Sequence, residues 1–463
     1  MVALIALLAA PPYSSDVVAR LIGAALSDGV AYARVAELSD GIGPRLSGSA
    51  GAEAAVKWAV QHLRDDGAEV RTEAVKVPHW VRGEERAEVL PARGRAGYAL
   101  AVTALGGSAG TPAGGVTADI VEVRSIAEVQ ALGDKARGKI VFFNHNMSTA
   151  GGKTGYGEMS PLRNHGPAQA AKVGAAAALV RSLATTSLRD PHTGATTFDD
   201  GAAKIPAAAL SVEDAELLHR LLQRGPVQVR LGLGCRTLAE VDSANVVADV
   251  RGREKPDEIV LLGAHLDSWD LGQGATDDGA GVAIVMEAAR LIAQLPQHPR
   301  RTVRVVLFMN EENGLAGGKA YAQAHAAEAE RHVAALESDA GAGRPVSIGL
   351  RAGEGAQALL APWLAPLDPL GAAEFGGEAG GADIGPLAAS RVAFVGVQQD
   401  VSRYFDYHHS AADTLDKIRP TDLAQTAAAV AWVAYALAEM AEPLPRPAAA
   451  PARAAGAASG RPQ

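Results

Sequence analysis

The chain contains one cysteine, Cys235, among its 463 residues. A single thiol cannot form an intramolecular disulfide, and it cannot build a zinc cluster that depends on cysteine ligands. Any metal site in this protein must therefore consist of His, Asp and Glu side chains. Because no histidine-rich stretch flanks Cys235, we expect a buried structural thiol and not a catalytic nucleophile.

Basic residues are also fewer than acidic ones, since the chain has 43 Lys and Arg against 52 Asp and Glu and a net charge of −9. A surface that follows nucleic acid would need clustered Lys and Arg, so we expect no nucleic-acid partner. After the first residues, no run approaches the ~20 apolar residues that a transmembrane helix requires. Hydrophobic residues still make up 48% of the chain, which allows a large core and two or three domains.

The two ends of the chain differ from the rest in composition. Residues 1–12, MVALIALLAAPP, resemble the apolar region and cleavage site of a secretory signal, although the basic segment that normally precedes them is missing. We therefore expect a secreted or periplasmic protein with an incomplete signal, and the alternative is an apolar lead into the first helix. Residues 443–463 are rich in Pro, Ala and Gly, which predicts a disordered tail.

Between these ends, the order of the predicted elements is typical of an α/β protein. Helices and then a strand are predicted in residues 13–112, with Ser49 as the cap of the second helix. In residues 239–442, apolar strands alternate with helices, and Thr421 is the predicted cap of the last helix. This alternation predicts a mixed, largely parallel doubly wound sheet flanked by helices.

A Gly-rich connector near residues 105–115 marks the junction between the first of these parts and a segment of different character. From 113 to 238, short strands are separated by turns and by two helical runs. We interpret this segment as a β-rich α+β domain inserted between the two halves of one α/β domain, residues 13–112 and 239–442. The insertion would explain why residues 13–112 lack chemistry of their own.

The stretch 259–281, IVLLGAHLDSWDLGQGATDDGAG, contains the first candidate metal ligands. His265 and Asp267 follow an apolar strand, at the sheet edge where open α/β proteins usually bind their ligands. The glycines that follow allow the loop to bring Asp277 or Asp278 back towards His265. On spacing alone, either aspartate could be the ligand.

Further candidate ligands follow the next predicted strands. Glu311 and Glu312 follow one strand, Asp339 follows another, and His408 and His409 lie in the segment YFDYHHSAADT. At least two imidazoles and three carboxylates would then meet at one sheet edge, which is enough for two divalent ions that share a bridging carboxylate. Mixed nitrogen and oxygen ligands favour zinc, and Mn²⁺ or Co²⁺ could substitute for it.

The segments HLDSWDLGQGATDDGAG, NEENGLAGG, ESDAG and HHSAADT resemble the co-catalytic dizinc aminopeptidase family. The similarity covers nearly the whole chain except the two ends. It implies a mixed, largely parallel eight-stranded sheet and makes the inserted segment similar to a protease-associated domain. Among the members of the family, the dipeptidase-like ones are the most similar.

The resemblance implies a role for each candidate residue. Glu311 would be the general base, which takes a proton from the water between the metals and passes it to the leaving amine. Asp267 would bind the second nitrogen of His265 and fix the tautomer of that ring. Asp277 would bridge the two zinc ions, with one ion completed by His265 and Asp339 and the other by Glu312 and His409.

Four further residues have less defined predictions. His408 stands where the family often has a tyrosine that stabilises the oxyanion; our hypothesis gives it that role or a contact with the substrate carboxylate, against a packed or solvated side chain. Asp278 is expected to bind backbone groups in a turn, with an unusual peptide geometry after Asp277. Asp383 is expected to cap a helix or contact substrate, and His192 to reach the cleft or lie exposed.

The sequence as a whole predicts a zinc-dependent exopeptidase that hydrolyses short unblocked peptides, above all dipeptides, through a hydroxide between the metals. A broader aminopeptidase that acts on longer peptides is the alternative. A glutaminyl-cyclase-like acyltransferase would need one zinc, and a non-catalytic binding protein would have lost ligands that this chain retains. The expected partners are a small peptide substrate and a possible second copy of the chain in a homodimer.

Overall fold

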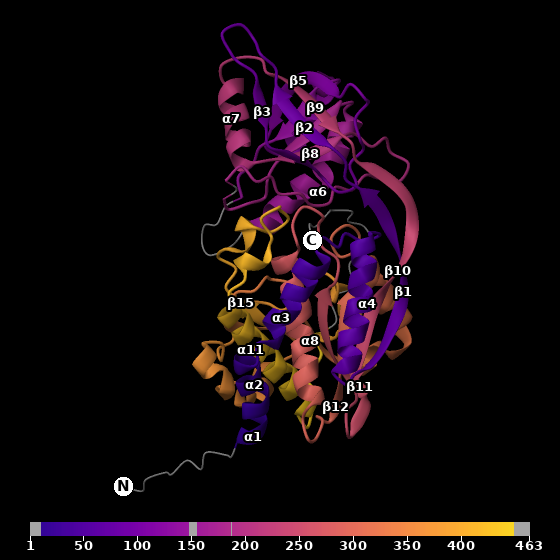
Figure 1. The fold of residues 1–463 in the computed structure, drawn as a ribbon, viewed down its shortest axis with the longest axis vertical. Coiled ribbons are helices and arrows are strands. Elements are labelled where there is room, and N and C mark those ends of the chain that lie inside the picture. Colours follow the sequence, from indigo (N-terminus) through magenta and orange to yellow (C-terminus); the bar gives the residue numbers. More distant parts are fainter. Residues whose placement is uncertain (1–10, 148–154, 187, 449–463) are drawn as a thin grey trace, which may run out of the picture.

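The computed structural model of the protein describes residues 11–147, 155–186 and 188–448. Within them the chain forms two β-sheets, one in the lower half of Figure 1 with helices around it and one in the upper half. Nearly all of the predicted signal segment and most of the predicted tail lie outside the described residues. Both therefore stay predictions.

The first sheet has seven strands in the order β1-β10-β12-β11-β13-β15-β14 within the described residues. Its four central strands, β12, β11, β13 and β15, run parallel, whereas the outer pairs are antiparallel. The predicted mixed sheet is confirmed, but parallel pairing is confined to its centre, and seven strands replace the expected eight. The strands are β1 (Glu69–Val81), β10 (Arg236–Val250), β11 (Lys255–His265), β12 (Arg301–Phe308), β13 (His332–Glu337), β14 (Pro345–Arg351) and β15 (Ala393–Gln399).

Both faces of this sheet are covered, which explains why its central strands read as continuous apolar runs. Successive residues of β11 point to opposite faces: Val260 and Leu262 join the larger core, and Ile259 and Leu261 join a smaller core with Tyr321. Helices α8 and α11 pack against each other on the larger core.

The helices begin and end at residues that agree in part with the predicted caps. Ser49 accepts a hydrogen bond from the amide of Ala52, as predicted for an N-cap. The Thr421 prediction is wrong, because the last helix begins at Pro420, which has no amide hydrogen that needs a cap. No described helix combines the length and apolar character needed to span a membrane. The α-helices are α1 (Ser15–Val18), α2 (Ala24–Ser27), α3 (Val30–Ala36), α4 (Ala50–Asp65), α5 (Ile126–Leu132), α6 (Tyr156–Lys172), α7 (Val212–Leu222), α8 (Ala280–Ala293), α9 (Ala316–Ala324), α10 (Ala356–Leu360) and α11 (Pro420–Glu439).

Among the described residues, the second sheet has eight strands in the order β3-β2-β9-β5-β6-β7-β8-β4. It includes β2 to β4, which precede residue 113, where the predicted insertion begins. The division into domains, with its likeness to a protease-associated domain, stays a prediction. The strands are β2 (Glu85–Val89), β3 (Tyr98–Leu100), β4 (Val102–Ala104), β5 (Val116–Val123), β6 (Ile140–Phe143), β7 (Ala177–Arg181), β8 (Ala207–Leu210) and β9 (Gln228–Leu233).

A ribbon made of β1 and β10 joins the two sheets and runs upward along the side of the molecule (Figure 1). The core of the second sheet also receives Trp269, which belongs to the loop after β11. Cys235 lies in the same core, is 2% exposed and donates to the carbonyl of Ser108, in agreement with a structural thiol. The two sheets therefore share buried residues beside the candidate site.

Candidate metal centre

The candidate site lies where the central strands of the first sheet end. His265 is the last residue of β11, and Glu312 and Asp339 follow β12 and β13. His409 comes from the loop between β15 and α11. Because β11, β12 and β13 are neighbours and parallel, their carboxyl ends place these side chains together.

The predicted ligands form two groups that share Asp277. One carboxylate oxygen of Asp277 lies 3.1 Å from Nε2 of His265, and that nitrogen is 3.6 Å from Oδ1 of Asp339. The other oxygen of Asp277 lies 3.2 Å from Nε2 of His409, which is 3.0 Å from Oε2 of Glu312. Two ligands at about 2.0–2.1 Å from a tetrahedral zinc are about 3.3 Å apart, so these spacings suit two ions on opposite sides of Asp277.

Burial and charge in the cluster also fit a metal site. Three overlapping groups of possible ligand atoms occur here, each with its atoms within 4.8 Å of one another. Oε1 of Glu312 is buried and has no hydrogen-bond partner in the described structure. Burial, reinforced by the charge of Asp277, raises the pKa of Glu312 to about 7. Divalent cations would reduce the repulsion between Glu312 and Asp277 and would give Oε1 of Glu312 a partner.

The loop that carries Asp277 is held by residues on several sides. Asp278 accepts hydrogen bonds from the amides of His265 and Gly281, which is the turn role expected of it, and the peptide bond between Asp277 and Asp278 is cis. Asp413 accepts from the amides of Thr276 and Asp277. A Cβ at Gly281 would lie 1.9 Å from the Ser338 carbonyl, so only glycine fits there.

Arg45 is a second support of the same loop, and the sequence analysis did not identify it. Its side chain is fully buried and donates to the carbonyls of Leu266, Gln273 and Gly274. Burial lowers the pKa of Arg45 to about 10 despite nearby carboxylates, so it stays charged near neutral pH. Nothing local in GIGPRLSGS marks this arginine, because apart from the nearby Gly43 carbonyl its side-chain partners lie more than 200 residues away.

Asp267 connects the carboxyl ends of β11 and β12. Its carboxylate accepts from the amides of Asn310 and Glu311 at 2.7 Å and 3.1 Å. Nδ1 of His265 lies 3.0 Å from the backbone carbonyl of Asp267 but 3.9 Å from its carboxylate. The carbonyl is therefore the closer partner of the imidazole, and the carboxylate holds the segment that presents Glu311 and Glu312.

Glu311, the predicted base, lies beside the ligands and is only partly covered. Burial raises the pKa of its carboxyl well above the usual range, and the charges of Asp339 and Glu312 raise it further. The side chain of Asp339 is 24% exposed, so the cluster opens to solvent near Glu311 and Asp339.

His408 is buried against His409, the predicted ligand, which excludes the solvated alternative. Its ring stacks on His409 with centroids 3.5 Å apart, and its Nε2 lies 3.5 Å from Asp277. Burial, together with the nearby His409, holds the pKa of His408 well below its ordinary value. The ring is therefore neutral near pH 7 and can donate one hydrogen bond.

The part of the chain from β2 to β9, called the second-sheet region below, contacts the loop that carries His408 and His409. Nδ1 of His409 lies 3.3 Å from the Thr193 carbonyl and 3.4 Å from the guanidinium of Arg163. The Thr193 amide donates to the His409 carbonyl at 2.8 Å, and His192 Nδ1 lies 2.6 Å from the His408 carbonyl. His192 is thus buried at the site and not exposed, whereas Arg163 was not identified from the sequence.

Asp383 is buried near the cluster but does not cap a helix. The short helix Gly385–Ser390 has no side-chain cap, and neither carboxylate oxygen of Asp383 has a hydrogen-bond partner among the described residues. The carboxylate of Glu337 instead accepts from the amides of Asp383 and Ile384. The cap prediction is wrong because a neighbouring strand supplies the acceptor.

Comparisons with known proteins identify the family. The sequence model of "Peptidase family M28" matches residues 245–434. Carboxypeptidase Q of Mus musculus is 40% identical over 417 residues, which cover 90% of this chain and 87% of the relative. This chain belongs to peptidase family M28. The prediction of a metallopeptidase is confirmed.

Solved structures agree with membership of family M28. A "Peptidase M28 precursor" from Shewanella amazonensis SB2B matches with a TM-score of 0.90 and 43% identity, covering 94% of this chain and 98% of that one. A zinc aminopeptidase from Bacillus subtilis matches with a TM-score of 0.64 over 89% of this chain and 95% of that one. At 19% identity, the second match shows the M28 fold alone.

Proposed function

We propose that this M28 peptidase is a zinc-dependent exopeptidase that hydrolyses short unblocked peptides, above all dipeptides. The observation that carries the proposal is the pair of His–carboxylate groups that share Asp277, with the partly covered Glu311 beside them. The names of the relatives support the class, since they include carboxypeptidase Q and a zinc aminopeptidase.

The donor set suits two zinc ions, with Mn²⁺ or Co²⁺ as substitutes. We assign Asp277 to both ions, His265 and Asp339 to one, and Glu312 and His409 to the other. Zinc ions held there would polarise the scissile carbonyl and lower the pKa of a bound water.

Glu311 is proposed as the general base for that water. Its backbone amide is held at 3.1 Å by the Asp267 carboxylate, so the side chain starts from a defined position beside the ligands. A carboxylate in this position can accept the proton of the water and then deliver it to the leaving amine.

His408 is proposed to donate a hydrogen bond to the oxygen that becomes negative in the transition state. Its Nε2 is 3.5 Å from Asp277, so the ring reaches the reacting centre. Replacing His408 by Ala should lower kcat/KM by about 100-fold for loss of one such donor. A decrease within a few-fold of wild type, in a variant that keeps its zinc, would assign His408 a packing role.

The main test is Glu311→Gln, assayed on a dipeptide together with zinc analysis. We expect two bound zinc ions and a decrease in kcat of at least about 1000-fold, because the isosteric amide cannot accept the proton. Glu312→Gln is the matched control next in the chain, and it should lose zinc. Near-full activity of Glu311→Gln would refute the base assignment, and zinc-loaded wild type that cleaves no peptide would refute the function.

The alternative of a broader aminopeptidase is tested by chain length. Dipeptides and tetrapeptides with the same first residue should differ in kcat/KM if short peptides are preferred, and equal values would favour the aminopeptidase. Export from the cytoplasm and a homodimer are further predictions, which fractionation of the native host and light scattering would check.

A further inference from the structure

A cavity of about 80 Å³ opens next to the candidate metal centre. Thr276 and Ala340 line it, and they adjoin the proposed ligands Asp277 and Asp339 in the chain. Tyr404 also lines the cavity, and its ring lies 4.9 Å from that of His408. Since one water occupies ~30 Å³, the cavity has room for a small polar group.

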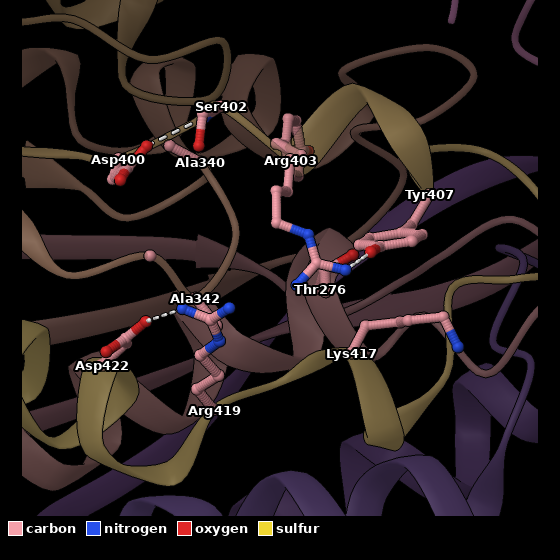
Figure 2. A pocket seen from close by; sticks show the side chains of 12 residues that line it. Thr276, Ala340, Ala342, Asp400, Ser402, Arg403, Tyr407, Lys417, Arg419 and Asp422 are labelled. Carbon is pink, nitrogen blue, oxygen red and sulfur yellow. Dashed lines mark hydrogen bonds and ion pairs between the residues drawn. The ribbon is translucent and has the colours of Figure 1, made fainter. Parts of the chain in front are cut away.

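Cationic side chains from two segments line this cavity, although the protein as a whole is acidic. Lys417 is paired with Asp416 at 2.5 Å, and Arg419 lies 3.8 Å from Asp422. Arg403 differs from both, because its contacts in the described structure are the ring and hydroxyl of Tyr407 and not a carboxylate. Figure 2 shows the guanidinium groups of Arg403 and Arg419 pointing towards one another.

We propose that this cavity binds the C-terminal carboxylate of the substrate, with Arg403 as its principal donor. The inference rests on the proposed peptidase function. A planar guanidinium can make two parallel hydrogen bonds to a carboxylate. Asp400 and Asp422 also line the cavity, but among the described residues no carboxylate lies within ion-pair distance of Arg403. Arg419, which also lines the cavity, adds positive charge.

The position of the cavity would favour dipeptides over longer peptides. An unblocked dipeptide carries a positive amine and a negative carboxylate, separated by about 7 Å at 3.3–3.6 Å per extended residue. The acidic metal cluster suits the amine, and the cavity begins at residues directly bonded to two of the ligands. The carboxylate of a longer peptide would extend beyond it.

The test compares leucyl-alanine, leucyl-alanine amide and leucyl-aspartate amide, using zinc-loaded wild type, Arg403→Ala and Arg403→Lys. We expect Arg403→Ala to raise KM for the free dipeptide about 10-fold, with kcat unchanged, because the lost contact is a charge-assisted hydrogen bond in a solvent-open pocket. The amide should be unaffected, and Lys should restore part of the binding. Arg351→Ala is the matched control, because Arg351 is also exposed and lies 5.6 Å over an aromatic ring, that of Phe394.

Three outcomes would overturn the proposal. Equal losses for dipeptide and amide would give Arg403 a structural role, and an unchanged KM for the dipeptide would remove it from binding. A loss seen only with leucyl-aspartate amide would make the cavity a site for acidic side chains.

If wild type hydrolyses none of these peptides, the proposed function fails separately. Calorimetric binding of leucyl-alanine and its amide to zinc-loaded Glu311→Gln, with and without Arg403→Ala, then decides on the cavity. Binding of the free dipeptide that weakens with Arg403→Ala supports the proposal, and unchanged binding overturns it.

Discussion

The two proposed ligand histidines, His265 and His409, lie in one cluster, but different regions of the molecule orient them. Nδ1 of His265 faces the carbonyl of Asp267, which is two residues away in the same loop. Nδ1 of His409 faces the carbonyl of Thr193, which is 216 residues away in the second-sheet region. In the half of the site that contains His265, the histidine is thus oriented from within its own loop, whereas the half that contains His409 depends on a distant region that packs against it.

The difference extends to the backbone. His409 adopts a φ of 62°, in the left-handed region that costs a non-glycine residue roughly 1–2 kcal/mol. The Thr193 amide donates to the His409 carbonyl, and contacts with Arg163 and Thr193 surround the ring. Metal binding in the half with His409 should therefore be the more sensitive to substitutions.

Asp277→Ala should have the largest effect, because Asp277 is the only proposed ligand shared by both halves. We expect zinc content to fall below one ion per chain and kcat/KM to fall by at least about 10⁴-fold. Elemental analysis and a dipeptide assay measure both effects. Asp242→Ala, in which an exposed aspartate is lost, is the control, and a variant of Asp277 that keeps two zinc ions would contradict the bridging role.

Arg163→Met should affect the two halves unequally. Loss of the guanidinium beside His409 should weaken one zinc by about 10- to 100-fold and leave the other unchanged, as expected when a contact to a ligand is removed. Titration with a chelator measures the two affinities.

Arg181→Met is the matched control for Arg163→Met, because Arg181 is similarly buried but contacts Glu216 and not a histidine of the site. Equal weakening of both zinc ions by Arg163→Met would show that the second-sheet region supports the whole site and not one half.

Acid should destabilise both regions through buried neutral histidines. Burial lowers the pKa of His192, in the second-sheet region, and of His332, in β13, to about 4 from an ordinary value near 6.5. The unfolded chain then binds more protons below pH 6.5, so stability falls as the pH decreases towards 4. From pH 7 to 5 we expect each to cost about 2 kcal/mol of unfolding free energy.

Urea unfolding of wild type and His332→Gln at pH 7 and pH 5 measures this effect. The variant should lose less stability on acidification, because it has no imidazole to protonate in the unfolded chain. Identical pH dependence in both proteins would show that His332 titrates normally when folded.

The smallest expected effect separates an observed cap from a wrongly predicted one. Ser49→Ala should lower the unfolding free energy by about 1 kcal/mol, because it removes the acceptor of the Ala52 amide. Thr421→Ala should change it by less than about 0.5 kcal/mol, since Thr421 lies inside the first turn of α11. Thermal or urea unfolding compares the two, and equal losses would contradict the cap assignment.

Much of the candidate site was predictable because its residues follow strands that short sequence patterns reveal. The run before His265 is apolar for both faces of a covered sheet, so its end marks the functional edge. Choosing Asp277 over Asp278 required the family resemblance, since spacing left both open. Their hydrogen bonds distinguish them, because Asp278 binds backbone amides whereas Asp277 faces both histidines.

The sequence by itself determined the α/β class, the apolar strands and the chemical nature of the ligands, since those follow from patterns within a few residues. Only the tertiary structure decided which carbonyl orients each histidine, which helix lacks its expected cap and where Arg45, Arg163 and Arg403 lie. Those contacts join residues that are far apart in the chain or depend on exact side-chain placement. The contacts of His409 with Thr193 and Arg163 form where the second sheet packs against the first, and no local pattern encodes that packing.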